Sequence, residues 1–253
     1  MIKIKTEKEI ELMAEAGQIL AKVMKQVSLM VKPGITTKEL DETAEALILS
    51  YGAKSSFKGH EGFPATLCTS VNEELVHCIP SDRKLKEGDI ISLDGGAHYK
   101  GYHSDMAITL PVGKVSPEVQ RLIWVTRKAL KRGIKKTRPG VTFGDIGNTI
   151  QRYIESQGYG VVRDLCGHGI GENLHEEPEV ANYGKRRSGD VVKEGMVFCI
   201  EPMVAIGDYN IKRARDGYGY QTKDGSLSAH FEHTIAVIKQ GVKVLTEIQG
   251  GLS

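Results

Sequence analysis

An internal repeat constrains the fold of this chain more than any other feature. The segment PGITTKELDETAEALILSYG (33–52) matches PGVTFGDIGNTIQRYIESQG (139–158) at an offset of 106 residues. Further on, KEGDIISLD (86–94) matches KEGMVFCIE (193–201), and HSDMAI (103–108) resembles HFEHTI (230–235). A duplicated chain predicts two related halves, about 1–115 and 116–253. We expect one domain over 1–253, in which a pseudo-two-fold axis relates the halves.

Each half begins with helix signals and continues with strand signals. Thr6 and Glu9 have the spacing of a capping box, as do Thr36 and Glu39, and apolar residues follow at helical spacing. The β-branched stretches GDIISL and MAITLPV read as strands on either side of a turn at Tyr99-Lys100-Gly101. The pattern predicts an α+β fold.

Four acids fall on equivalent positions of the two halves. The repeat aligns Asp94 with Glu201 and Asp105 with Glu232. A hairpin centred between residues 99 and 100 would place Asp94 directly opposite Asp105, where like charges are destabilising. The simplest alternative is that these are surface acids on half-exposed hairpins. Because the arrangement occurs twice, we favour four carboxylates converging on two divalent cations, which would balance their charge.

Oxygen ligands with one imidazole suit Mn, Fe, Co or Zn in a two-metal hydrolytic site and argue against structural zinc. His168, between glycines in CGHGIGENLHEEP (166–178), is the strongest histidine candidate, and His175 is weaker. His77 alone reads as a histidine at a strand end. His103-Ser104-Asp105 offers an alternative, the facial triad of non-haem iron oxygenases, but it leaves three acids unexplained. His230 and His233 also flank the acids.

Composition excludes several classes of protein. The net charge of +2 gives no argument for nucleic-acid binding, the N-terminus has no signal-peptide pattern, and no apolar run approaches the 18 residues of a membrane span. No CxxC pair occurs, so we expect reduced thiols in a cytoplasmic protein. The cysteines are Cys68, Cys78, Cys166 and Cys199.

Taken in order, SVNEELVHCIPSDRKLKEGDIISLD, GYHSD, GHGIGENLHEEP, IEPMV and SLSAHFEHTIAV closely resemble the type I methionine aminopeptidases, in their short form without an N-terminal zinc-binding extension. The resemblance covers nearly the whole chain. It implies the pita-bread fold, a curved antiparallel sheet with outer helices. It also implies five ligands for two metal ions: Asp94, Asp105, His168, Glu201 and Glu232. Glu201 would also accept a proton from the attacking water, His175 would stabilise charge at the scissile carbonyl, and His77 would contact the peptide.

The same resemblance implies a pocket for the methionine side chain, formed by Phe57, His60, Phe63, Cys68, Leu174 and Tyr218. An apolar pocket with sulfur and aromatic edges suits a thioether. The chain departs from the family pattern at several positions: His60 and Tyr218 stand where tyrosine and tryptophan are usual, Leu174 where phenylalanine is frequent, and Cys78 and Ser104 where glycine is usual. These departures affect the expected side-chain preference and leave the ligands intact.

The expected function is metal-dependent removal of the initiator methionine from nascent proteins and peptides with a small second residue. The alternatives are an X-Pro peptidase of the same fold, a non-catalytic binding module, and the oxygenase. We expect a monomer. A basic stretch, RKALKRGIKKTR (127–138), places Arg127, Lys128, Lys131, Lys135 and Arg138 on roughly one helix face. We favour a solvated surface there, with ribosomal RNA contact as the second hypothesis.

Overall fold

The computed structural model describes residues 1–248. Four α-helices and fifteen strands are present in this part of the chain. In chain order the elements are α1 (Glu7–Ser28), α2 (Thr37–Ser50), β1 (Lys54–Ser55), the short 3-10 helix η1 (His60–Gly62), β2 (Leu67–Val71), β3 (Glu74–Val76), β4 (Ile90–Tyr99), β5 (Tyr102–Pro111), α3 (Pro117–Lys136), α4 (Phe143–Ser156), β6 (Gly160–Val161), β7 (Gly167–Gly169), β8 (Glu176–Val180), β9 (Val197–Ile200), β10 (Met203–Ala205), β11 (Ile211–Arg213), β12 (Tyr220–Thr222), β13 (Ser228–His230), β14 (Glu232–Ile238) and β15 (Gly241–Val244).

Helices α2 and α4 begin in the same way, which explains why the repeat conserves particular residues. Thr36 caps α2 in a capping box with Glu39, and Thr142 caps α4 in a capping box with Asp145. Gly34 precedes the first cap at φ 93° and Gly140 precedes the second at φ 89°. Glycine adopts this left-handed backbone without the steric cost that a Cβ brings. The predicted box at the start of α1, between Thr6 and Glu9, is also confirmed.

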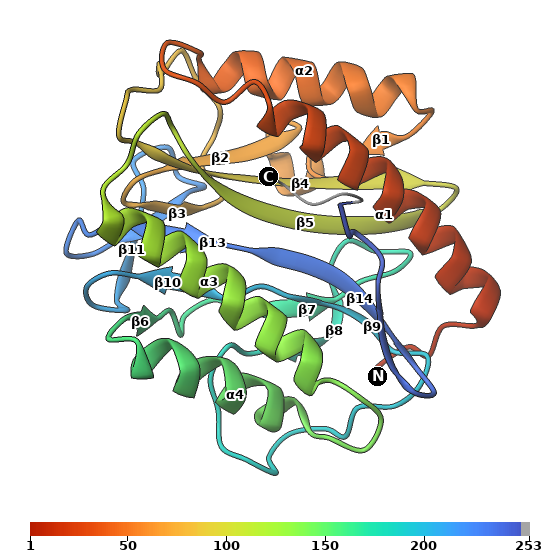
Figure 1. The fold of residues 1–253 in the computed structure, drawn as a ribbon. Coiled ribbons are helices and arrows are strands. Elements are labelled where there is room, and N and C mark those ends of the chain that lie inside the picture. Colours follow the sequence, from red (N-terminus) through yellow and green to blue (C-terminus); the bar gives the residue numbers. More distant parts are fainter. Residues whose placement is uncertain (249–253) are drawn as a thin grey trace.

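The two halves share one sheet. Its strand order is β1-β4-β5-β14-β9-β7-β8, with β2 paired to β4 and β15 paired to β14. Strands β5 and β14 therefore meet at the seam between the halves, antiparallel, with Glu232 opposite Ala107. Two three-stranded sheets, β13-β10-β6 and β11-β12-β3, complete the structure. In Figure 1, α1 and α3 cross in front of the large sheet, while α2 and α4 lie above and below it. This arrangement confirms the predicted α+β class.

The predicted register of the β4–β5 hairpin is wrong by two residues. Tyr99 pairs with Tyr102, so Asp94 lies opposite Ala107, and Asp105 lies opposite Gly96. The turn consists of Lys100 and Gly101, both with positive φ (49° and 89°), a conformation that matches the twist of a two-residue hairpin. Residues two apart in a strand share a face, so the two aspartates remain diagonal neighbours on one face of the sheet.

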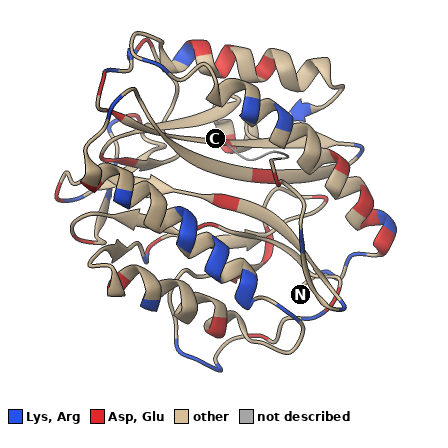
Figure 2. Cartoon of the chain, viewed as in Figure 1, with Lys and Arg blue, Asp and Glu red and all other residues tan. Residues whose placement is uncertain are grey.

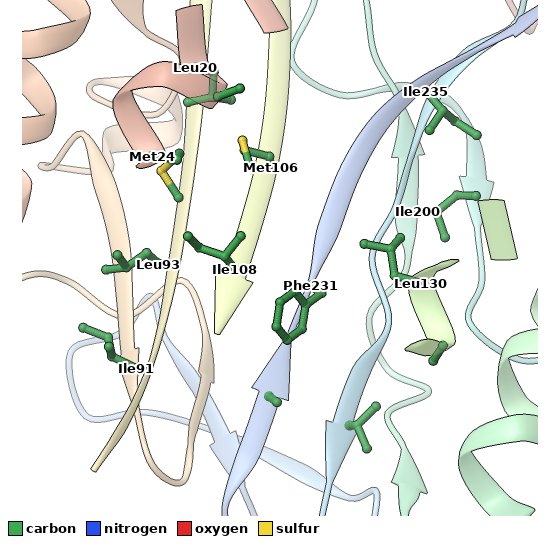
Figure 3. Packing of buried hydrophobic residues seen from close by; sticks show 14 of the residues in the cluster. Leu20, Met24, Ile91, Leu93, Met106, Ile108, Leu130, Ile200, Phe231 and Ile235 are labelled. Carbon is green, nitrogen blue, oxygen red and sulfur yellow. The ribbon is translucent and has the colours of Figure 1, made fainter. Parts of the chain in front are cut away.

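The core separates the helices from the acid-bearing face. Leu20 and Met24 of α1 face the side of the sheet that carries Met106, and on the other half of the core Leu130 of α3 lies close to Ile200 (Figure 3). Because side chains alternate across a strand, Asp105 points to the opposite face from Met106. The acids therefore lie on the face away from the helices. None of the helices in residues 1–248 has the length and apolarity that crossing a membrane requires.

Candidate metal centre and substrate pocket

Five predicted ligands come from five neighbouring strands. Asp94 lies on β4, Asp105 on β5, Glu232 at the start of β14, Glu201 directly after β9, and His168 in the middle of β7. These strands follow one another in the sheet as β4-β5-β14-β9-β7. One acidic segment is visible on each of the two central strands in Figure 2. Sheet pairing therefore brings together residues that lie up to 138 positions apart in the sequence (232 minus 94).

The ligand atoms converge on a small volume. His168 Nε2 lies 3.8 Å from Glu201 Oε1 and 3.9 Å from both Asp105 Oδ2 and Glu232 Oε1. Oxygen atoms of Asp94, Asp105 and Glu232 all lie within 4.8 Å of one another. His168 Nδ1 is 2.9 Å from the carbonyl oxygen of Gly169, which can only accept. Nδ1 therefore carries the proton, and Nε2 is the free lone pair facing the carboxylates.

The four carboxylates are buried at relative exposures of 9% or less. Burial raises the pKa of Asp105, Glu201 and Glu232 well above their usual values, and neighbouring carboxylates raise each further. Burial also raises the pKa of Asp94, to about 6. The pKa of His168 is lowered to about 3, first by burial and then by His175. The protein by itself thus disfavours the charged state of every one of these groups.

This centre fits divalent cations. No lysine or arginine among the described residues pairs with these carboxylates, and the side-chain nitrogens recorded near them belong to the imidazoles of His168 and His230. Asp94 Oδ1, Asp105 Oδ1 and Glu232 Oε1 are buried without any hydrogen-bond partner among the described residues. Leaving such atoms unpaired costs about 1–3 kcal/mol each, and more when they are charged. Carboxylates with one neutral imidazole form the donor set of dinuclear Mn, Fe, Co or Zn sites.

Of the other histidines singled out in the sequence, His175 and His77 line the same cavity as the cluster, whereas His103 lies outside it. His175 precedes β8, and its ring packs edge-on against His168 with centroids 4.5 Å apart. His77 follows β3 with φ at 60°, a strained conformation for a residue other than glycine. His103 is engaged elsewhere, because its Nδ1 lies 2.9 Å from Ser56 Oγ and its ring stacks on His98. It does not join the carboxylate cluster, which removes the basis for a facial triad.

A cavity of about 510 Å³ opens onto the cluster. Cys68 pairs directly with Asp94 across β2 and β4, so the wall of the cavity adjoins a carboxylate of the cluster. Phe63 packs edge-on against Tyr218, whose hydroxyl donates to the Gly62 carbonyl at 2.9 Å. All thirteen predicted site residues line this cavity: Phe57, His60, Phe63, Cys68, His77, Asp94, Asp105, His168, Leu174, His175, Glu201, Tyr218 and Glu232.

Sequence reasoning missed several residues of this region. Arg213 and Tyr220 line the cavity from β11 and β12, a hairpin that the sequence showed only as a turn-rich insertion. Thr234 Oγ1 accepts from the Asp105 N–H at 2.9 Å and donates to its carbonyl, which fixes β5 against β14. No local sequence signal indicates that Arg213 and Tyr220 line the cavity or that Thr234 joins the two strands. Cys199 also adjoins the cluster, and burial raises the pKa of its thiol.

Comparison with known proteins agrees with this geometry. Residues 11–239 match the family described as metallopeptidase family M24. The methionine aminopeptidase of Clostridium perfringens is 47% identical over 249 residues, which are 98% of this chain and the whole of that protein. The crystal structure of methionine aminopeptidase from Rickettsia prowazekii is 42% identical, with a TM-score of 0.96 over 98% of this chain and 100% of that one.

A prolidase from Pyrococcus furiosus is a more distant relative. It is 27% identical with a TM-score of 0.79, and the match covers 96% of this chain and 65% of the prolidase. These likenesses confirm the predicted pita-bread fold, which the two groups share, and they confirm the expectation of a metal-dependent peptidase. The chain belongs to metallopeptidase family M24 and, within it, to the methionine aminopeptidases.

Proposed function

We propose that this protein removes N-terminal methionine from nascent proteins and peptides with a small second residue, by metal-dependent hydrolysis. The observation that carries the proposal is that the carboxylate–histidine cluster lines the same cavity as a group of aromatic, aliphatic and sulfur-bearing side chains. A hydrolytic centre next to an apolar pocket suits a substrate whose terminal side chain is a thioether. Membership of the methionine aminopeptidases supports the same assignment.

The ligand set of this proposal is the one that the family resemblance implies, and the closeness of the five side chains supports it. In this proposal Asp94, Asp105, His168, Glu201 and Glu232 would together hold two divalent cations. Asp105 and Glu232 are the central members of this set, because each lies close both to His168 and to Asp94. Two bound divalent cations would supply positive charge that polarises the scissile carbonyl and lowers the pKa of water.

The remaining chemistry falls to side chains of this chain. Glu201 is placed to accept a proton from the attacking water and to return it to the amide nitrogen as the C–N bond breaks. His175 is the donor for the oxygen that becomes negative when the carbonyl carbon turns tetrahedral. His77 faces the same cavity and contacts the peptide. Phe57, His60, Phe63, Cys68, Leu174 and Tyr218 hold the methionine side chain.

The test is a metal-reconstitution assay. The protein is stripped with a chelator and supplied with Mn, Co, Fe or Zn, and hydrolysis of Met-Ala-Ser is followed beside an X-Pro dipeptide. Metal-dependent release of methionine, with the X-Pro peptide intact, supports the proposal. Glu201→Gln should lose more than a hundredfold in kcat, whereas Glu179→Gln, an exposed glutamate on β8 opposite His168, should not. Cleavage of only the X-Pro peptide would move the function to the prolidase class.

We further propose that the chain acts as a cytoplasmic monomer with a single catalytic domain. The described cysteines are free thiols, as a reducing compartment favours. Both halves contribute strands to the large sheet and ligands to the cluster, so neither half holds the site alone. Coincident unfolding transitions by fluorescence and circular dichroism would support the single domain, and the mass of one chain by light scattering would support the monomer. Separate transitions or a dimer mass would oppose them.

Ribosome contact is proposed for the outer surface of α3. Arg127, Lys128, Lys131 and Lys135 are exposed there, and the basic stripe is visible in Figure 2. Trp124, 48% exposed, lies beside Lys128 and adds a stacking surface. Arg138 lies beyond the helix end at Lys136, so it was wrongly included in the helix face. Co-sedimentation with ribosomes that weakens steeply with salt supports this contact, and its absence at low salt refutes it.

A further inference from the structure

His230 is a second imidazole at the edge of the carboxylate cluster, and no role is yet assigned to it. It ends β13, and its relative exposure is 1%. Both of its ring nitrogens are buried without a hydrogen-bond partner among the described residues. Each unpaired buried nitrogen costs about 1–3 kcal/mol. This cost is offset only where something binds the ring.

The backbone of His230 is rigidly held. The Thr109 hydroxyl on β5 accepts from the His230 N–H and donates to the His230 carbonyl, both at 2.8 Å. Thr109 Oγ1 is itself 2.8 Å from Ser92 Oγ on β4. Three strands therefore fix the position from which the imidazole extends. A ring fixed in this way is suited to ligation, because little conformational freedom remains to be lost.

The rings of His230 and His168 approach different carboxylate oxygens of Glu201. His230 Nε2 lies 3.7 Å from Glu201 Oε2, and His168 Nε2 lies 3.8 Å from Glu201 Oε1. Both separations are too long for hydrogen bonds. Two atoms that each lie ~2.0–2.2 Å from one ion are ~3–4 Å apart, so both separations fit shared ligation of a cation. Ligand atoms of Glu201, His230 and Glu232 all lie within 4.8 Å of one another.

We propose that His230 Nε2 is a sixth ligand atom of the metal centre, bound at the edge formed by Glu201 and Glu232. The inference rests on the proposed function only in that both need the centre to hold a divalent cation. A second imidazole favours Co, Fe and Zn over Mn, because Mn prefers carboxylate and water ligands.

Pulsed electron paramagnetic resonance of the metal-stripped protein, loaded with one equivalent of Cu(II), counts the coordinated imidazoles. The expected result is two imidazoles in the wild type and one in both His230→Gln and His168→Gln. His103→Gln, a histidine bonded to Ser56, is the matched control and should keep two. Isothermal titration should show Co(II) affinity falling tenfold to a hundredfold in His230→Gln, and Mn(II) affinity falling less.

Two results would overturn the inference. One is a single imidazole in the wild type; the other is an unchanged signal and unchanged Co(II) affinity in His230→Gln. Circular dichroism of the metal-free variant checks its fold, and glutamine should be accommodated because no hydrogen bond of the ring is lost. Methionine release is measured separately. Wild-type protein that binds Cu(II) through two imidazoles but cleaves no peptide would sink the proposed function and leave the ligand assignment standing.

Discussion

Replacing Lys5 by methionine should lower the free energy of unfolding by about 3 kcal/mol, because it breaks a buried ion pair. Lys5 Nζ lies 2.6 Å from Glu176 Oε2, and the two side chains are only 4% and 6% exposed. Removing one partner of such a pair typically costs 3–5 kcal/mol, since a charge stays buried without compensation. Lys3 Nζ lies 3.7 Å from Glu176 Oε1, so Glu176 keeps one cationic neighbour after Lys5 is replaced. We therefore expect a loss of stability at the lower end of that range.

The same pair should influence catalysis. Glu176 directly follows His175, and its Oε1 accepts from the Asn173 N–H at 3.2 Å. The Lys5 N–H donates to the Gly195 carbonyl, so the N-terminal segment is anchored while it holds this loop. Lys5 is thus a positioning residue for His175 and Leu174. We expect Lys5→Met to raise KM for Met-Ala-Ser more than it lowers kcat, with Lys5→Arg restoring part of the loss.

Urea unfolding of metal-free protein at pH 7, followed by circular dichroism, measures the stability change. Lys100→Met is the matched control, because Lys100 pairs with Glu15 at 2.7 Å while both side chains are about half exposed. Exposed pairs contribute about 0–1 kcal/mol. The double variant Lys5→Met/Glu176→Gln should lose less than the sum of the single changes. Equal losses in Lys5→Met and Lys100→Met would refute the reasoning.

The pH dependence gives a second check on this pair. Burial raises the pKa of Glu176, but hydrogen bonds from Lys5 and the Asn173 N–H outweigh it, so the net pKa is lowered. An acid with a lowered pKa in the folded protein stabilises it above the pKa of the unfolded chain, about 4.3 for glutamate, and this contribution is lost as the pH falls. The stability difference between wild type and Lys5→Met should therefore shrink below about pH 4.

Three further outcomes are expected. Burial raises the pKa of Asp94 to about 6 in the absence of metal, whereas the pKa of an aspartate in the unfolded chain is about 3.9, so the folded protein holds this proton more tightly. The free energy of unfolding of the metal-free protein, measured with urea, should therefore fall as the pH rises from 4 through 6. Excess Mn(II) should abolish that fall. Asp105→Asn should stabilise the metal-free protein at pH 8 by about 1 kcal/mol or more, because it removes a buried carboxylate whose charged form is disfavoured. The same variant should bind Mn(II) at least tenfold more weakly by calorimetry. A metal-free variant that is less stable than the wild type would contradict this reasoning. In Gly96→Ala the new Cβ would lie 2.6 Å from Ser56 Cβ and 3.0 Å from Phe57 Cε1. The free energy of unfolding should therefore fall by about 1–3 kcal/mol, and KM for Met-Ala-Ser should rise. An unchanged free energy of unfolding together with an unchanged KM would refute the close contact.

Local features of this protein could be predicted because their causes are local. Thr36 and Glu39 satisfy helix N–H groups three residues apart, and Gly34 adopts a left-handed backbone that other residues resist. The repeat extended this reasoning to Thr142 and Gly140, and it aligned the acids of the two halves. The pocket and the roles of His77 and His175 came from family resemblance, because no spacing rule indicates them.

The amino-acid sequence by itself determined the helix caps, the turn glycines and the equivalence of Asp94 and Glu201 in the internal repeat. Only the tertiary structure decided the hairpin register, which depended on whether Lys100 and Gly101 alone form the turn. It also decided that Lys5 meets Glu176, 171 positions away, and that His230 faces Glu201. The physical reason is that these contacts depend on which strands pair and on which face each side chain leaves, and strand pairing is settled only when the whole sheet has formed.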